Sequence, residues 1–367
     1  KLFKLPVSIS VSKLEIYAES PFKFYVEAVL KPQPRRISKV EIYDLGNIYH
    51  RAVEEFTNVI INNKLDIKEM KREDVFKISQ SCTDSVLSEK QQEIIALEAN
   101  ERHSYLKNKI KRLVDRAALT IIEQLKRGSF SPEFTEFKIE KKIMLSDGQI
   151  IRLHGRADRI DIMKKDNVSY INIIDYKSSH KDIDLSDTVQ GLQLQLMIYM
   201  SAIMENGEKL MHSNPEIGGV YYFCIDDPIV DGDNLSKRTP EDEIFSKLAL
   251  KGYVAENMEV ISNMDNKIEE AKASDIIPVS LNKDGSTKKT SKTLAVNEYK
   301  SILNKTDEVS KKIAKEIMDG FVDIKPFRKD SSTGSAVPCR YCEYLSICKF
   351  DTAAGNKYRK IKKQSRD

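Results

Sequence analysis

The sequence predicts an α/β fold in which the strands lie between helical regions. Three observations predict it: apolar residues recur at helical spacing before about residue 130, they alternate or run with β-branched residues from about 137 to 178, and helical spacing then returns. A sheet between helical regions can bury its faces against them. With 367 residues, the chain can hold one large decorated domain or two modest ones.

Two helical regions precede the predicted sheet. Segment 38–60 carries apolar residues at helical spacing, namely Leu45, Ile48, Tyr49, Ala52, Val53 and Phe56. From Ser85 to Arg127 the spacing is again helical, with dense charges between the apolar positions. We expect an amphipathic helix over the first segment and one or two long helices over the second, each packing on a core by one face.

Three consecutive strands are predicted next. The segments KIEKKIML (138–145), QIIRLHGRADRIDIM (149–163) and VSYINIIDYKS (168–178) alternate or run with β-branched residues. The turn signals SDG and KKDN separate them, so we expect a meander.

The second half of the chain is predicted to alternate again. Segment 186–207 has helical spacing, with Asn206-Gly207 as its C-cap, and a strand follows at 217–225. Further helices are expected at 241–263 and 295–319. The polar stretch LNKDGSTKKTSK (281–292) is expected to be an exposed hairpin tip or loop.

Composition excludes several classes of protein. Hydrophobic residues make up 40% of the chain and charged residues 32%, which is typical of a soluble globular protein. No apolar run of about 18 residues and no signal-peptide pattern is present, so we expect a cytoplasmic protein without a membrane partner. No G-xxxx-G-K-[ST] phosphate loop is present, so we expect no ATP binding by this chain. The basic tail 357–367 could contact phosphate or be a solvated end.

The strongest pattern is GRADRID (155–161) followed by IIDYKSS (173–179), which places carboxylates on two neighbouring strands. Alternation puts Asp175 and Lys177 on one face of their strand. Hydrolysis of a phosphodiester requires charge neutralisation and an activated water, and carboxylates such as Asp158 and Asp175 supply both by holding Mg²⁺ or Mn²⁺. A neighbouring lysine can orient the water and offset developing charge.

The competing interpretation is that these three residues are exposed and form ordinary ion pairs. The apolar run Ile171, Ile173 and Ile174 argues against it, because it indicates a buried strand. Charged groups on a buried strand are costly unless they are paired or bind metal.

A second pattern is Cys339-x2-Cys342-x5-Cys348. Thiolates at these gaps converge naturally on one metal centre, zinc or iron-sulfur, although three unrelated thiols are the alternative. The five cysteines are an odd number in a chain without export signals, which does not favour a disulfide framework.

An ordered series of motifs resembles the RecB-family nucleases, of the PD-(D/E)xK class, and within them the C-terminal nuclease regions of AddB-type subunits of helicase-nucleases. The series runs through SVSKLEIYAESPFKFY, DLGNIYHRAVEEF, HGRADRID, IIDYKSS, GLQLQLMIY, GGVYYF and PCRYCEYLSICKFD. It covers nearly the whole chain, whereas a lone D-x-K motif has little specificity. The resemblance implies an α/β restriction-endonuclease-like core, with a central mixed sheet flanked by helices and with helical insertions, in a single decorated nuclease domain. Its expected parts are an N-terminal helical segment (1–130), the catalytic sheet and helix (131–230), accessory helices and a loop (231–330) and the cysteine motif with the tail (331–367).

The resemblance also implies residue roles around the metal. Asp158 and Asp175 match the two metal carboxylates, His50 the metal-binding histidine, and the backbone carbonyl of Tyr176 a further ligand. Lys177 matches the catalytic lysine. From the residues alone, His50 could instead be a structural histidine on its helix.

Two further positions match the Q-xxx-Y motif of the family. Gln195 and Tyr199 lie four residues apart, on one helix face, and are expected to position DNA at the site. Tyr199 could equally be a core aromatic. His154 lies on the same strand face as Asp158 and is the obvious local candidate for a metal ligand, but the family pattern places that role on His50.

For the cysteine motif, the resemblance implies a [4Fe-4S] cluster whose fourth cysteine precedes Pro-Phe near the N-terminus. Ser20 stands at that position in this sequence, before Pro21-Phe22, so the sequence departs from the pattern. The presence of the cluster is therefore in doubt for this chain. Such a cluster would join distant chain segments and take no part in hydrolysis.

The function implied is metal-dependent exonuclease activity on single-stranded DNA from a processed duplex end, within a helicase-nuclease that acts in double-strand-break repair and recombination. The implied partners are an AddA-type subunit and the rest of an AddB-type chain. Two alternatives stay open: a non-cutting DNA-binding scaffold, and a stand-alone RecB-like exonuclease of the CRISPR-adaptation type.

Overall fold

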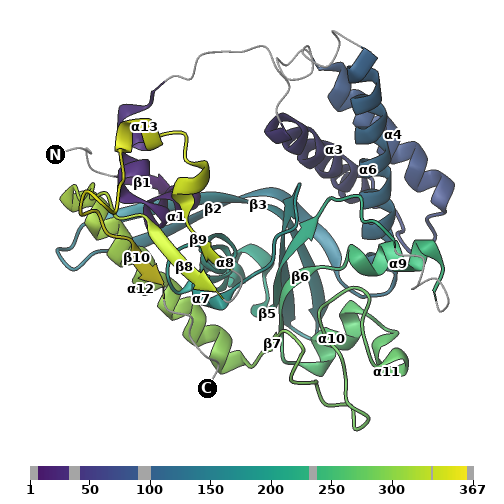
Figure 1. Cartoon of the computed structure of the whole chain (residues 1–367). Helices are drawn as coiled ribbons and strands as arrows, with labels where there is room; N and C mark the ends of the chain where they lie inside the picture. The colour runs from purple at the N-terminus through teal and green to yellow at the C-terminus, as the bar shows by residue number, and fades with distance from the viewer. Residues whose placement is uncertain (1–6, 33–41, 90–100, 231–237, 332–333, 362–367) are drawn as a thin grey trace.

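A computed structural model describes residues 7–32, 42–89, 101–230, 238–331 and 334–361. Its centre is a seven-stranded mixed sheet with the order β1-β3-β4-β5-β6-β7, and β2 pairs with β3 beside this path (Figure 1). The strands are β1 (Val7–Ser10), β2 (Ser131–Met144), β3 (Ile150–Lys165), β4 (Val168–Lys177), β5 (Asn214–Cys224), β6 (Lys251–Ala255) and β7 (Thr293–Leu294). The α/β class with a central mixed sheet is confirmed.

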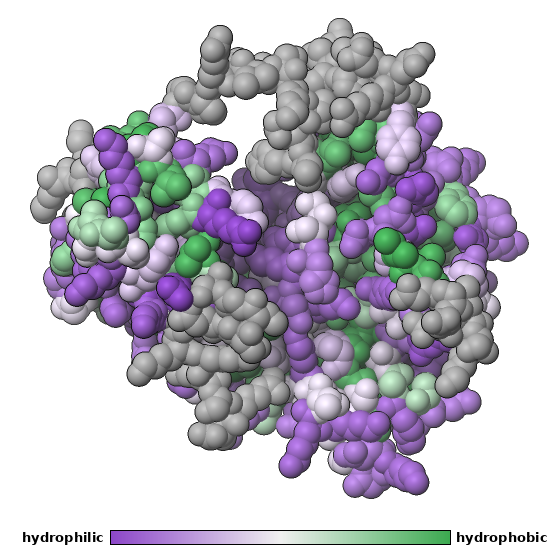
Figure 2. Space-filling view, viewed as in Figure 1, coloured by the Kyte–Doolittle hydropathy of each residue, from purple (hydrophilic) through white to green (hydrophobic). Residues whose placement is uncertain are grey.

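Helices cover both faces of this sheet. One face packs against α1 (Val11–Glu19), α8 (Gln195–Met211) and α12 (Val296–Asp319). The other face packs against α3 (Ile42–Asn62), α6 (Glu101–Lys126) and α10 (Met258–Met264), and α4 (Arg72–Ser88) lies outside α3 and α6. Alternation along β4 sends Ile173 to the first core and Ile174 to the second. The face seen in Figure 1 is hollowed near its middle, and hydrophilic residues predominate in the hollow (Figure 2).

Shorter elements complete the described chain. They are α2 (Pro21–Phe24), a π-helical turn (Tyr25–Leu30), α7 (Leu185–Thr188), α9 (Pro240–Lys247), α11 (Ile268–Ala271), a 3₁₀ turn (Pro338–Tyr341) and α13 (Leu345–Cys348). A separate small sheet has the order β10-β8-β9, formed by β8 (Phe327–Ser331), β9 (Gly334–Ala336) and β10 (Arg359–Ile361). Among the helices described, none is long and apolar enough to cross a membrane.

Several predicted elements are confirmed. The meander is formed by β2, β3 and β4, which pair antiparallel in sequence order. The strand expected at 217–225 is β5, and the helix expected at 295–319 is α12. The loop at 281–292 is largely exposed between the buried residues Leu281 and Ser291, and a bridge between Leu281 and Thr287 closes its first part.

The first helical region is α3, although residues 38–41 of the predicted segment lie outside the described residues. The region from Ser85 to Arg127 is only partly correct. The helix α6 fills its second half, whereas residues 90–100 lie outside the described residues and Ser85–Ser88 end the earlier helix α4.

The helix predicted at 186–207 is wrong at both ends. It is broken after α7, because Gly191 adopts φ +89°, and it restarts at Gln195. Asn206 and Gly207 lie inside α8, which continues to Met211 and is capped by His212 in the left-handed conformation. A glycine one turn short of a helix end gives the same local signal as a C-cap, and here packing continues the helix past it.

The single helix predicted at 241–263 is also wrong, because β6 divides it into α9 and α10. Residues 251–255 pair with β5 and β7, and this pairing overrides their local helical spacing. Gly252 lies so close to the backbone of Val220 that a side chain there would collide with it.

Candidate active site

The candidate site lies where the central sheet forks. On one edge of β3, residues 151–154 pair with β1 and residues 159–165 pair with β4. Residues 155–158 between them pair with neither of these strands. The fork leaves one edge of this stretch, which contains Asp158, without a neighbouring strand.

Both predicted metal carboxylates meet at this fork. The β3–β4 register ends at the pair Arg159–Ile174, one position before Asp158 and Asp175 would face each other. Beyond this pair, the side chain of Asp158 replaces the backbone hydrogen bonds between the two strands, since its Oδ2 accepts a hydrogen bond from the backbone N–H of Tyr176 (2.7 Å). Asp158 is 9% exposed and Asp175 is 1% exposed, so both acids are held at the floor of the site.

Asp175 is the hub of the polar contacts on the α8 side of the sheet. Its Oδ2 forms an ion pair with the ammonium of Lys177, as alternation along β4 predicts. Its Oδ1 accepts a hydrogen bond from Nε2 of Gln195 (2.7 Å), the first residue of α8. The structure therefore brings Asp175, Lys177 and Gln195 together.

His50 approaches the same acids from the opposite face, on α3. Its Nδ1 lies 3.4 Å from Oδ2 of Asp158, and its Nε2 donates a hydrogen bond to the carbonyl oxygen of Tyr176 (2.6 Å). The imidazole and this carbonyl are thus already neighbours, but a cation bound by both would require their hydrogen bond to open.

His154 lies elsewhere. It is exposed, and its Nδ1 is 2.9 Å from the hydroxyl oxygen of Ser8 on β1. The histidine beside the acids is therefore His50, 108 positions before Asp158 in sequence, and not the one four positions before it.

Tyr199 fills the fork from α8. It is 4% exposed, and its hydroxyl oxygen accepts a hydrogen bond from the backbone N–H of Arg156 (3.1 Å), in the stretch of β3 that pairs with neither β1 nor β4. Gly155 is required here because a Cβ at this position would lie 2.5 Å from Cε1 and 2.6 Å from Cζ of the Tyr199 ring. In this structure Tyr199 supports β3, and its direct contact with DNA stays a prediction.

Glu15, on α1, was not singled out from the sequence. Its Oε1 accepts hydrogen bonds from the backbone N–H groups of Leu194 (2.7 Å) and Gln195 (2.9 Å), where α8 has no side-chain cap from its own N-cap residue. The carboxylate therefore caps the helix that presents Gln195 and Tyr199. No local signal could have shown this, because the partners are about 180 residues apart.

The electrostatics of the acids fit a cation. Burial raises the pKa of Asp158 well above its usual value, and the charge of Asp175 raises it further. The Oδ2 atom of Asp175 is buried and accepts no hydrogen bond within the described residues, although Lys177 lies beside it. Burial lowers the pKa of His50, which favours the neutral imidazole that binds metals.

In this structure, the predicted metal ligands do not surround one common ion position. Within the part of the chain that the structure describes, no three His, Cys, Asp or Glu side chains converge on one ion position. His50 nevertheless neighbours both Asp158 and the carbonyl oxygen of Tyr176, and Asp175 lies near enough for its charge to raise the pKa of Asp158. We conclude that these residues fit a divalent cation.

The cysteine motif lies beside the N-terminal segment, and within the residues that the structure describes its thiols do not form a metal site. Cys339, Cys342 and Cys348 are free and partly exposed. Ser20 is buried, and its hydroxyl accepts a hydrogen bond from the backbone N–H of Lys23 (3.3 Å) as the N-cap of α2. Because this hydroxyl is used as a cap, we assign no cluster chemistry to it.

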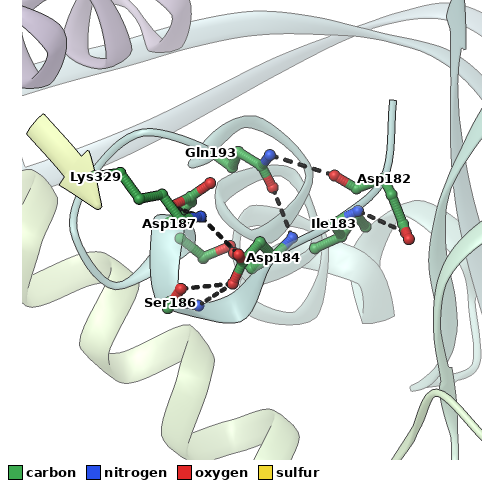
Figure 3. A network of polar contacts seen from close by, with 8 residues as sticks. Asp182, Ile183, Asp184, Ser186, Asp187, Gln193 and Lys329 are labelled. Carbon is green, nitrogen blue, oxygen red and sulfur yellow. Dashed lines mark hydrogen bonds and ion pairs between the residues drawn. The ribbon is translucent and has the colours of Figure 1, made fainter. Parts of the chain in front are cut away.

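Ion pairs attach the small C-terminal sheet to the segment between β4 and α8. Lys329 on β8 donates to Asp184 and Asp187, each at 2.7 Å (Figure 3). Asp184 also accepts from the backbone N–H of Ser186 (2.9 Å), and its backbone N–H donates to Gln193 (2.9 Å). This network, the Lys329 clamp, fixes the start of α7.

Comparisons with known proteins agree with this geometry. Residues 8–349 match the model of the PD-(D/E)XK nuclease superfamily. The chain is 37% identical, over 98% of its length, to 31% of the B subunit of an ATP-dependent helicase/deoxyribonuclease from Caldanaerobacter subterraneus subsp. tengcongensis. It is 36% identical over all of its length to 32% of the protein of this name from Thermoanaerobacter sp., and 35% identical over all of its length to 32% of the one from Clostridium acetobutylicum.

The chain thus spans about a third of the length of these relatives. The family model covers nearly all of the described residues, including both strands of the fork and the helix that carries Gln195 and Tyr199. The expected restriction-endonuclease-like class is therefore confirmed, and the chain belongs to the PD-(D/E)XK nuclease superfamily.

Proposed function

We propose that this chain hydrolyses phosphodiester bonds of single-stranded DNA with a divalent cation held at the fork of the sheet. One observation carries the proposal: Asp158, Asp175 and Lys177 meet at the stretch of β3 that pairs with neither β1 nor β4. A buried pair of acids is costly in a protein interior, and a bound cation removes that cost.

The residues take the following roles. Asp158, Asp175, the imidazole of His50 and the carbonyl oxygen of Tyr176 would hold the cation. Bound there, a divalent cation would supply charge neutralisation for the phosphate and a water molecule of lowered pKa. Mg²⁺ or Mn²⁺ suits the carboxylates, and an imidazole ligand favours Mn²⁺.

Lys177 orients the attacking water and offsets the charge that develops on the phosphate, since its ammonium is fixed beside Asp175 by their ion pair. Gln195 keeps Asp175 in one rotamer through its hydrogen bond, and Tyr199 keeps the open stretch of β3 in place. We propose that both also line the path of the DNA strand, which would reach them at the mouth of the fork.

The larger setting is proposed from the relatives. They are named as B subunits of an ATP-dependent helicase/deoxyribonuclease, and this chain corresponds to about a third of each. We propose that the chain is the nuclease part of an AddB-type protein. An AddA-type partner and the rest of the AddB-type chain would then deliver a single strand from a duplex end in the cytoplasm, as a step in double-strand-break repair and recombination.

The whole chain acts as one decorated nuclease domain in this proposal. Strand β1 from the N-terminal segment and strand β7 from residues 293–294 both join the catalytic sheet, which supports it. A [4Fe-4S] cluster at Cys339, Cys342 and Cys348 is not needed for hydrolysis. Attachment of the C-terminal sheet rests instead on the Lys329 clamp and on Arg359, which donates to the carbonyl oxygen of Ala18.

The test is degradation of 5′- and 3′-labelled single-stranded DNA in Mn²⁺ by the natural chain and by Asp175→Ala, purified in parallel. We expect the natural chain to shorten the DNA and the variant to be at least 100-fold slower, because loss of a metal carboxylate removes several kcal/mol of transition-state stabilisation. DNA binding without cleavage by the natural chain would favour the scaffold alternative. Equal cleavage by both proteins would refute the assigned site.

A further inference from the structure

We infer that Lys181 is a second cationic residue of the active site, which binds a phosphate of the DNA backbone beside Lys177. The inference rests on the proposed nuclease function, and it concerns the substrate contacts of that same site. It arises from the connection between β4 and α7, which the D-x-K motif does not include.

The backbone of Lys181 is fixed to the end of β5. Its N–H donates to the sulfur of Cys224 (3.4 Å), and the thiol of Cys224 lies 3.6 Å from the carbonyl oxygen of Lys181. Cys224 is also the register partner of Lys177 in the β4–β5 pair. The strand pairing therefore holds Lys181, four positions later in the sequence, next to Lys177.

The two ammonium groups share one aromatic ring. The Nζ atom of Lys181 lies 4.9 Å from the ring centroid of Tyr222, and the Nζ atom of Lys177 lies 5.4 Å from it. Tyr222 is 2% exposed and is the register partner of Asp175. The ring therefore forms a floor under both cations, directly beside the predicted metal carboxylate.

The charges of the two lysines are not equally balanced. Lys177 has its ion pair with Asp175, whereas no carboxylate of the described residues lies within ion-pair distance of the Lys181 ammonium. Burial and the charge of Lys177 lower the pKa of Lys181, while Glu15, Asp175 and Glu19 act in the opposite direction from farther away. A partly buried cation without a near counter-ion is costly, so the position favours binding of an anion.

The chemistry of the site identifies the anion. A phosphodiester strand that presents one phosphate to Asp158, Asp175 and Lys177 carries further phosphates on both sides. An ammonium group binds phosphate oxygens as a point charge, without base specificity. Lys181 therefore provides a sequence-independent phosphate contact, which suits an enzyme that cuts a strand repeatedly.

The experiment measures binding of a fluorescent single-stranded oligonucleotide to the intact chain in EDTA, over a series of salt concentrations. The variants are Lys181→Met, which keeps the aliphatic stem on Tyr222 and removes the charge, and Lys181→Arg, which keeps the charge. Lys311→Met, at an exposed position on α12, is the matched control. Melting curves of each variant establish that it is folded.

We expect Lys181→Met to bind about 3- to 10-fold more weakly at low salt, and its plot of log affinity against log salt concentration to be less steep by about 0.7, the value for one phosphate contact on a single strand. Lys181→Arg should keep the slope, and Lys311→Met should match the natural chain. A merely structural lysine would lower the melting temperature of Lys181→Met and leave the slope unchanged.

An unchanged slope for Lys181→Met, or an equal loss in Lys311→Met, would overturn the inference. Failure of the proposed function looks different: the natural chain would then not cut DNA in Mn²⁺, or would cut it no faster than Asp175→Ala does. Cleavage by the natural chain together with an unchanged slope in Lys181→Met would refute only the role of Lys181.

Discussion

Replacement of Gly155 by alanine tests the packing that opens the fork of the sheet. The added Cβ would lie 2.5 and 2.6 Å from two ring carbons of Tyr199, where carbon atoms normally approach to about 3.5 Å. The ring must then move by about 1 Å, in a core position that is 4% exposed. Overpacking of this kind costs about 1–3 kcal/mol of folding free energy.

Gly155→Ala should also slow DNA cleavage, because the displaced ring loses its hydrogen bond from the backbone of Arg156 and frees the stretch of β3 that holds Asp158. Urea unfolding measures the first effect, and the rate of DNA cleavage in Mn²⁺ measures the second.

The double variant Gly155→Ala/Tyr199→Leu provides the control. Leucine removes the ring atoms that collide with the new Cβ, so the penalty of Gly155→Ala should be much smaller in a Tyr199→Leu background than in the natural chain. If Gly155→Ala leaves both stability and cleavage unchanged, or if its cost is the same in both backgrounds, the contact between Gly155 and Tyr199 is not what shapes the fork.

Three further predictions concern groups around the site. Asp158→Asn should abolish cleavage yet raise the free energy of unfolding of the metal-free protein at neutral pH, because the pKa of Asp158 is raised in the folded state. Urea unfolding over a pH series should show this stabilisation vanish below about pH 4, where the carboxyl is protonated in the unfolded chain as well. Glu15→Ala should cost about 1–2 kcal/mol and reduce cleavage, while Glu15→Gln, which keeps an acceptor for the N-terminus of α8, should retain most of both; equal loss in the two variants would contradict the capping role. Lys329→Ala should cost only about 1 kcal/mol, since its ion pairs are partly exposed, but should speed proteolysis of the C-terminal sheet, and an unchanged digestion pattern would exclude the clamp.

Local pattern was sufficient for the centre of this protein. The alternation of IIDYK determined that Asp175 and Lys177 share a face, and the apolar residues before them determined that the strand is buried. The meander and the long amphipathic helix α12 follow from the same periodicities. The ordered motifs added the family, which the match to residues 8–349 confirms.

Local pattern did not predict the secondary structure where a segment or a glycine packs against residues distant in sequence. The segment 241–263 has helical spacing, but residues 251–255 are captured by β5 and β7. Likewise, Gly207 resembles a C-cap, yet it lies inside α8, where it packs against Pro215. In both cases the tertiary contact overrides a local preference of at most about 1 kcal/mol per residue.

What the sequence determined by itself is which residues are candidates for phosphodiester hydrolysis and which side of their own strand or helix they occupy. The tertiary structure alone decided that β3 leaves β1 before it joins β4, that Glu15 caps α8, and that Lys181 lies beside Lys177 over Tyr222. The physical reason is that periodicity fixes the direction of a side chain within its own element, whereas contacts between distant elements depend on how whole faces pack, and no short stretch of sequence contains that information.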